Sequence, residues 1–147
     1  IDLTPLKNLH TLTLCRFIDL TDLSPLSHLN TLILDRCVSV TDLTPVSNLY
    51  RLTLIKCIHL IDVSPVQNVK ILKIVECDKI IDVSSLGNVY NLTIEWCQGI
   101  TDISKLTNNS ILSIRGCSNI SNFGSRKFHI IEGSKIFEIN NQFLSLL

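Results

Sequence analysis

Six cysteines and four histidines are the side chains of this chain best suited to metal binding or nucleophilic chemistry. Five of the cysteines recur every twenty residues, which is not a zinc-finger spacing, and no C-x-x-C pair accompanies them. We therefore predict that each is a small buried residue whose weak S–H points at a backbone carbonyl, with no metal or cofactor bound. Because a row of free thiols suits a reducing compartment, we expect a cytoplasmic protein. The five are Cys37, Cys57, Cys77, Cys97 and Cys117.

Cys15 and the histidines stand outside this column. Cys15 falls two places before the cysteine position and is expected to face solvent, which makes it the thiol most open to modification. The histidines occupy four different places in the period, and none has a Ser, Cys or carboxylate at a recognised catalytic spacing. Because the P-loop, G-x-S-x-G and H-E-x-x-H motifs are also missing, we predict that the chain is not an enzyme and has no catalytic residues.

An aspartate also recurs every twenty residues, from Asp2 to Asp102. Ligands for one metal would not be spread one per repeat, so turn formation explains this column better than calcium binding. A column of asparagines, from Asn8 to Asn108, stands just before each expected strand. Asn tolerates the left-handed conformation that ends a turn, and we predict that conformation there.

These columns belong to a twenty-residue repeat that runs through most of the chain. We number the positions of each repeat from 1 to 20, beginning at Ile1, and call each repeat a rung. Apolar residues fill positions 3, 6, 12, 14 and 20, and the alternation over positions 12 to 14 predicts a short strand with one buried face. Ser or Thr at position 4, followed by Pro at position 5, predicts an N-cap and a single 3₁₀ turn.

The run from Leu29 to Cys37 has the form L-x-x-L-x-L-x-x-C, and Thr41-Asp42 follows it. This pattern resembles a leucine-rich repeat. The T-D-L-S-P-L-x-x-L portion is similar to the short repeats of phosphatase regulators and internalins, and the Cys resembles that of F-box repeats. The resemblance implies an α/β solenoid, a leucine-rich-repeat arc with a parallel β-sheet on the concave face and 3₁₀ turns or loops on the convex face. A parallel β-solenoid without helical turns is the alternative.

The two ends of the chain depart from the period. We expect 1–120 to form six repeats and 121–147 to form a degenerate seventh repeat and a C-terminal cap, with continuation into a further domain as the alternative. The chain begins in mid-repeat, so we also expect more repeats, another domain or a partner on that side. The apolar residues expected in the cap are Phe128, Ile130, Ile131, Ile136, Ile139 and Phe143.

Composition narrows the class of partner. Thirteen Lys and Arg balance thirteen Asp and Glu, and a formal net charge of zero argues against a protein whose affinity comes from neutralising phosphates. The apolar runs are far too short to cross a bilayer. We therefore predict a protein partner and no nucleic-acid or membrane partner.

Stacked repeats build an extended surface that such proteins commonly use for binding, and positions 11 and 13, with 10, 15 and 16 beside them, should line it. Both tyrosines and the tryptophan fall on or beside this strip, and Tyr, Trp and Arg are enriched at binding hot spots. We predict a non-enzymatic interaction module, either an intracellular adaptor or recognition subunit or, as the alternative, an assembly component that contacts partners through its ends. The predicted protein-binding patch consists of Arg36, Arg51, Lys56, Lys73, Tyr90 and Trp96.

Overall fold

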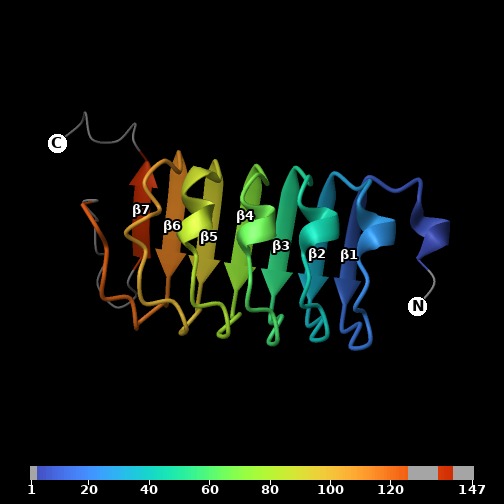
Figure 1. The fold of residues 1–147 in the computed structure, drawn as a ribbon, viewed down its shortest axis with the longest axis horizontal. Coiled ribbons are helices and arrows are strands. Elements are labelled where there is room, and N and C mark those ends of the chain that lie inside the picture. Colours follow the sequence, from blue (N-terminus) through green and yellow to red (C-terminus); the bar gives the residue numbers. More distant parts are fainter. Residues whose placement is uncertain (1–2, 126–135, 141–147) are drawn as a thin grey trace.

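The computed structural model describes residues 3–125 and 136–140 and shows a single sheet along a row of stacked rungs (Figure 1). The strands follow sequence order, so each rung adds one strand beside that of the rung before. The first six are parallel, and the seventh is antiparallel to the sixth. The chain is therefore a repeat solenoid, as predicted. The strands are β1 (Thr11–Cys15), β2 (Thr31–Asp35), β3 (Arg51–Ile55), β4 (Ile71–Val75), β5 (Asn91–Glu95), β6 (Ile111–Arg115) and β7 (Ile136–Asn140).

The parallel strands pair in a register of one whole repeat, with Leu12 beside Leu32 and Leu32 beside Leu52. Positions 12 and 14 point into the coil, where Leu32 and Leu34 are fully buried. Because side chains alternate along a strand, positions 11, 13 and 15 point outward, where they are half-buried or exposed. One face of the sheet therefore repeats the same apolar packing in every rung, while the other is free to vary.

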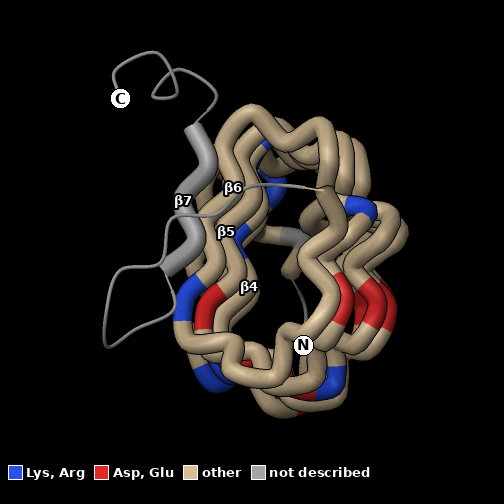
Figure 2. Tube along the Cα trace, turned by 90° about the vertical axis from the view of Figure 1, so that its left-hand side faces the viewer, with Lys and Arg blue, Asp and Glu red and all other residues tan. Residues whose placement is uncertain are grey.

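The side of the coil opposite the sheet carries short 3₁₀ helices. Figure 2, which looks along the row of rungs, shows this side and a column of acidic positions on it. Proline in the first turn of η2, η3 and η4 fits there because its missing N–H has no partner to lose. The helices are η1 (Thr4–Leu6), η2 (Ser24–Leu26), η3 (Thr44–Val46), η4 (Ser64–Val66) and η5 (Ser84–Asn88).

The helices begin in a different way from the one predicted. Ser24 is the first helical residue, not the N-cap, and its N–H donates to Oδ1 of Asp22 at 2.8 Å. The same bond recurs from Thr44 to Asp42, so the aspartate column supplies the turn chemistry. A carboxylate two residues before the helix reaches this N–H directly, which leaves the Ser or Thr hydroxyl no capping role. The prediction of turn formation by Asp is confirmed, and that of a Ser or Thr N-cap is wrong.

The left-handed residues also lie elsewhere than predicted. The asparagines at position 8 do not adopt positive φ. The residue before them is right-handed helical, as at Ser47 with φ −62° and ψ −21°, so the turn that Leu49 N closes onto Val46 O at 3.4 Å is of type I and needs no left-handed residue. Positive φ falls instead at position 16, directly after each strand, where Lys56 has φ 52°. Its N–H still bonds to Val75 O of the next rung at 2.9 Å, so the chain turns inward without leaving the hydrogen-bond ladder.

The cysteine column follows that turn and is buried, as predicted. The Cys37 thiol donates to Leu14 O at 3.6 Å and lies 3.8 Å from Asp35 O. All five column cysteines are free and buried. Burial raises the pKa of the Cys97 thiol to about 12, so it stays protonated at neutral pH. These thiols act as small apolar residues with a weak donor.

In rung 6, the segment that forms a 3₁₀ helix in rungs 1 to 5 is a turn. The proline is absent, and Asn109 replaces the apolar residue at position 9. Its Nδ2 donates to Leu86 O at 2.8 Å and to Val89 O at 2.7 Å. A buried amide that reaches two backbone carbonyls costs little to bury, so this polar residue ties rung 6 to rung 5.

The ends of the described chain differ from one another. β1 pairs only with β2, and beside it Leu6, Leu12 and Phe17 are only partly buried. At the other end, a parallel bridge joins Asp102 to Asn122 before β7 closes the sheet. Most of the predicted cap residues lie outside the described residues, so the cap stays a prediction. No helix of the described part is long and apolar enough to pass through a bilayer.

Candidate protein-binding surface

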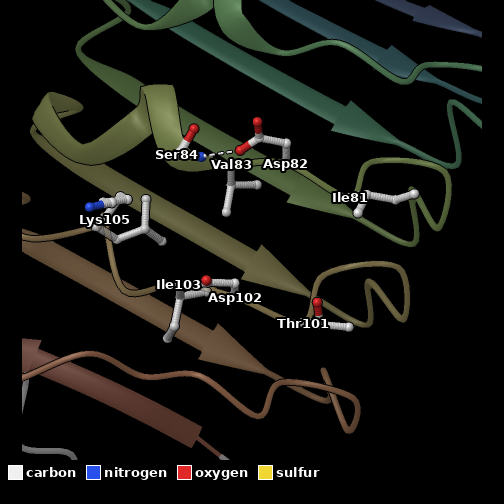
Figure 3. Close-up of a pocket in the computed structure, with 9 residues that line it drawn as sticks. Ile81, Asp82, Val83, Ser84, Thr101, Asp102, Ile103 and Lys105 are labelled. Carbon is white, nitrogen blue, oxygen red and sulfur yellow. Dashed lines mark hydrogen bonds between the residues drawn. The ribbon is translucent and has the colours of Figure 1, made fainter.

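A groove opens on the side of the coil opposite the sheet, between rungs 5 and 6, with a volume of about 360 Å³. Asp82 and Asp102 line it, and Asp82 Oδ1 accepts the Ser84 N–H at 2.8 Å (Figure 3). These carboxylates therefore hold turns. Ile61 and Ile81 are 62% and 63% exposed at position 1 nearby. None of the six predicted patch residues lines this groove.

The predicted patch residues all lie on the outward side of the sheet. We call this surface the outer strip, formed by positions 10, 11, 13, 15 and 16 of rungs 2 to 6. Arg51 and Tyr90 lie where strands begin, Lys73 lies in mid-strand, and the other three follow strand ends. Because a strand rises about 3.3 Å per residue, five residues separate the two sides by about 16 Å. The structure therefore divides the predicted patch into two edges instead of one compact cluster. The residues after the strand ends are Arg36, Lys56 and Trp96.

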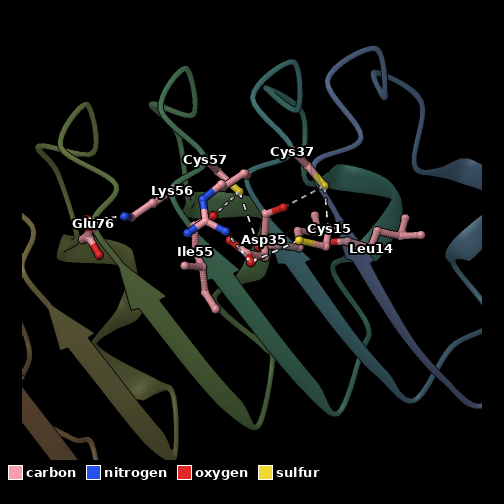
Figure 4. A network of polar contacts seen from close by, with 10 residues as sticks. Leu14, Cys15, Asp35, Cys37, Ile55, Lys56, Cys57 and Glu76 are labelled. Carbon is pink, nitrogen blue, oxygen red and sulfur yellow. Dashed lines mark hydrogen bonds and ion pairs between the residues drawn. The ribbon is translucent and has the colours of Figure 1, made fainter.

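We call the side where strands end the carboxyl edge. Its Arg and Lys side chains form ion pairs with neighbouring carboxylates. It comprises Asp35, Arg36, Lys56, Glu76 and Trp96. Arg36 Nη1 lies 3.0 Å from Asp35 Oδ2, and Lys56 Nζ lies 3.1 Å from Glu76 Oε2 (Figure 4). These pairs are partly exposed, so each contributes little to stability, but each cancels a charge that a partner would otherwise meet.

Lys73, in the middle of the strip, is compensated in the same way. Its Nζ lies 3.1 Å from Glu95 Oε2 on the next strand. Three of the four cations of the predicted patch thus have a carboxylate partner within the chain. The sequence contains the signal for this, because Glu76 and Glu95 stand one rung on from their partners.

Asp35 joins the carboxyl edge to Cys15. The Cys15 thiol is exposed, as predicted, and donates to Asp35 Oδ2 at 3.3 Å (Figure 4). The same oxygen accepts from Arg36 at 3.0 Å, while Oδ1 is hidden from solvent and has no partner among the described residues. The exposure of Cys15 is confirmed, whereas this contact was not predicted; its signal in the sequence is that Cys15 and Asp35 both occupy position 15 of their rungs.

Trp96 lies over the next rung. Its backbone has φ 57°, and the Arg115 guanidinium carbon lies 5.9 Å from the ring centroid. A Cβ built on Gly116 would come within 2.2 Å of the Trp96 ring. Gly116 is therefore the residue that leaves room for the indole, and its own φ of 67° also favours glycine. Much of one face of Trp96 is used within the chain.

The side where strands begin, which we call the amino edge, has the opposite character. It comprises Tyr50, Arg51, Lys70 and Tyr90. Tyr50, Lys70 and Tyr90 occupy position 10 of consecutive rungs, joined by the bonds of Ile71 N to Tyr50 O and of Asn91 N to Lys70 O at 3.0 and 3.1 Å. Lys70 Nζ lies 4.1 Å from the Tyr90 ring centroid. Tyr50 is 51% and Tyr90 45% exposed.

Neither cation of the amino edge has an ion-pair partner among the described residues. Tyr50 and Lys70 were expected on the strip but not in the patch, because position alone does not show which cations are neutralised. The structure adds them to Arg51 and Tyr90 as neighbours.

The described residues bring together no three His, Cys, Asp or Glu side chains that could hold a metal ion. The fold and this surface define a repeat solenoid with an open, varied sheet face. No protein-family model matches the chain. No curated protein matches its sequence.

Proposed function

We propose that the chain is a leucine-rich-repeat module that binds a protein partner on its outer strip, without catalysis, as an intracellular adaptor or recognition subunit. The observation that carries this proposal is the contrast between the two faces of one sheet. Positions 12 and 14 hold Leu or Ile in all six rungs, whereas positions 11, 13 and 15 hold apolar, polar and charged residues of both signs. Constant packing beneath a varied face is what a recognition surface needs.

The aromatic residues support the same face. Tyr50, Tyr90 and Trp96 lie at its two edges, each about half exposed. Exposed Tyr and Trp side chains supply large contact areas at low entropic cost, which suits binding hot spots. The leucine-rich-repeat assignment within this proposal rests on the L-x-x-L-x-L-x-x-C run together with the buried thiol that donates to a strand carbonyl.

A second function, assembly through the ends, is favoured by β1. Among the described residues this strand has a hydrogen-bonded neighbour on one side only, and its Leu12 and the nearby Phe17 are only partly buried. An edge strand over an incompletely covered core is a surface on which another strand can add. This function would use β1 and leave the outer strip free.

Site-specific photo-cross-linking separates the two. A photoreactive residue is placed at Thr53 or Thr93 in the middle of the outer strip, at Thr11 on β1, or at Gln67 on the opposite side. After irradiation in lysate of cells that make the protein, we expect one shared product from Thr53 and Thr93 and none from Gln67. Product from Thr11 alone would favour assembly, and equal products from all four positions would contradict a defined site.

A further inference from the structure

The charges of the rungs are sorted by repeat position. Between residues 3 and 125, every Asp and Glu falls at positions 15 to 19 or at position 2, and none falls at positions 3 to 14. Cations are found in both parts. The carboxylates are Asp19, Asp22, Asp35, Asp42, Asp62, Glu76, Asp78, Asp82, Glu95 and Asp102.

The amino edge lies wholly in the part without carboxylates. Arg51 is exposed, neither it nor Lys70 has an ion pair among the described residues, and Lys70 Nζ lies over the Tyr90 ring. The cations of the carboxyl edge and Lys73 already have carboxylates at 3.0 to 3.1 Å. On the outer strip, the cations without an ion pair among the described residues are Arg51 and Lys70 at the amino edge and Arg115 at position 15 of rung 6. The Arg115 guanidinium carbon lies 5.9 Å from the Trp96 ring centroid. Of these cations, Arg51 and Lys70 lie on neighbouring rungs, and two exposed tyrosines flank them.

We propose that the amino edge, formed by Tyr50, Arg51, Lys70 and Tyr90, docks an acidic segment of the partner protein. This inference rests on the proposed function of the outer strip. Arg51 presents a fork that accepts a carboxylate in bidentate fashion, and Lys70 on the next rung, about 4.8 Å along the row, meets a second one. The tyrosine rings pack against the segment on either side and exclude water from both pairs.

A protein segment fits this edge better than a nucleic acid. Tight binding to a phosphate backbone needs many cations, and the edge offers two on a chain of zero net charge. Across the strip, Arg36, Lys56 and Lys73 are already paired with carboxylates, so a long polyanion that extended beyond the edge would lack cations to neutralise it. A short acidic stretch needs only the two cations of the edge.

The test is a titration of the whole chain, labelled with ¹⁵N, with an acetylated peptide of alternating glutamate and glycine at low ionic strength. We expect the largest amide shifts at positions 10 and 11 of rungs 3 to 5, and none with the glutamine analogue of the peptide. The Arg51→Gln/Lys70→Gln variant should bind roughly tenfold more weakly, whereas Arg16→Gln/Lys79→Gln, which removes the same charge elsewhere, should stay within about twofold. Retained amide dispersion shows that each variant is folded.

Three outcomes would overturn the inference. They are an absence of peptide binding by the folded chain, equal weakening by the two double variants, and tighter binding of a single-stranded oligonucleotide at the same amides. The cross-linking from Thr53 and Thr93 does not depend on the charge of the partner. If that cross-linking succeeds while the peptide fails, the acidic segment is wrong and the binding face stands; if it fails, the face itself is wrong.

Discussion

The amino edge and the carboxyl edge of the outer strip are built on the same strands, and yet they differ in what they leave for a partner. At the carboxyl edge, Lys56 is paired with Glu76, and Trp96 lies over Gly116. At the amino edge, Arg51 has no ion pair among the described residues, and the Tyr50 ring is half exposed. Residue types that mark a hot spot are present at both, but the two cations of the amino edge have no ion pair among the described residues, whereas Arg36 and Lys56 at the carboxyl edge do. Residue composition alone therefore does not identify a binding edge. What matters is whether its charged side chains already have ion-pair partners within the chain.

The largest loss of stability is expected from a substitution in the hydrophobic core, which lies behind both edges. Leu54 is fully buried behind the strip, and Leu54→Ala should cost about 2 to 5 kcal/mol through lost burial and a residual cavity. Trp96 emission reports the carboxyl edge and tyrosine emission the amino edge, so urea unfolding followed by both probes measures the loss. Both transitions should move together. A change in one probe alone would mean that the edges do not share one cooperative core.

Gly116→Ala should affect one edge only. The added Cβ meets the Trp96 ring at 2.2 Å on a backbone of positive φ, so we expect a loss of about 1 to 3 kcal/mol and a red shift of Trp96 emission as the indole is displaced. Affinity of the amino edge for the acidic peptide should stay within about twofold. An unshifted emission spectrum would contradict the packing described for Trp96.

Acid should weaken the whole solenoid through the aspartate column on the side of the coil opposite the sheet. Hydrogen bonds from the Thr44 hydroxyl and N–H lower the pKa of Asp42, and those from the Ser84 N–H and hydroxyl lower that of Asp82. Each carboxylate is more acidic folded than unfolded. Its contribution is therefore complete above its unfolded pKa of about 3.9 and is lost as the pH falls through the lower folded value.

Urea midpoints measured between pH 7 and pH 2 should accordingly fall below about pH 4. Asp42→Asn keeps an oxygen acceptor for the Thr44 N–H but does not titrate, so it should flatten this decline. A midpoint that rises on acidification would contradict the role given to the aspartate column.

The smallest effect is expected from the ion pair between Lys56 and Glu76. A double-mutant cycle with Lys56→Gln and Glu76→Gln should give a coupling below about 1 kcal/mol, because both side chains are well exposed. Arg51→Gln should leave the free energy of unfolding unchanged within error. A larger stability loss from Arg51→Gln than from Lys56→Gln would mean that the amino edge has a partner within the chain.

The repeat fold could be predicted from the sequence because its signal is redundant. Six copies of the period fix the strand at positions 12 to 14 and the buried thiol at Cys37, and each copy repeats the same physical requirement. Two predictions were wrong, those of the helix-capping residue and of the left-handed residue, because more than one residue of the repeat is chemically able to fill each role. Asp22 performs the capping expected of Ser24, and the turn inward at Lys56 needs the left-handed backbone expected at the asparagines.

The candidate site was harder to predict because it depends on pairing between rungs. Arg51 and Lys56 are both cations of rung 3, and stacking of the rungs brings the carboxylate of Glu76 to Lys56 but no carboxylate of the described residues to Arg51. Lys70 was undervalued for the same reason, since its place between two tyrosines appears only when the rungs are stacked. The repeat position of a residue predicts whether its side chain points outward, but not whether that side chain already has an ion-pair partner.

The most direct test compares the two edges against the partner captured through Thr53. Its affinity is measured for the wild type, for Arg51→Gln/Lys70→Gln at the amino edge and for Lys56→Gln/Trp96→Leu at the carboxyl edge. We predict a loss of roughly tenfold or more for the amino-edge variant and of less than about threefold for the carboxyl-edge variant. The reverse order would contradict the account, because the binding energy would then come from Lys56 and Trp96, which already have partners within the chain.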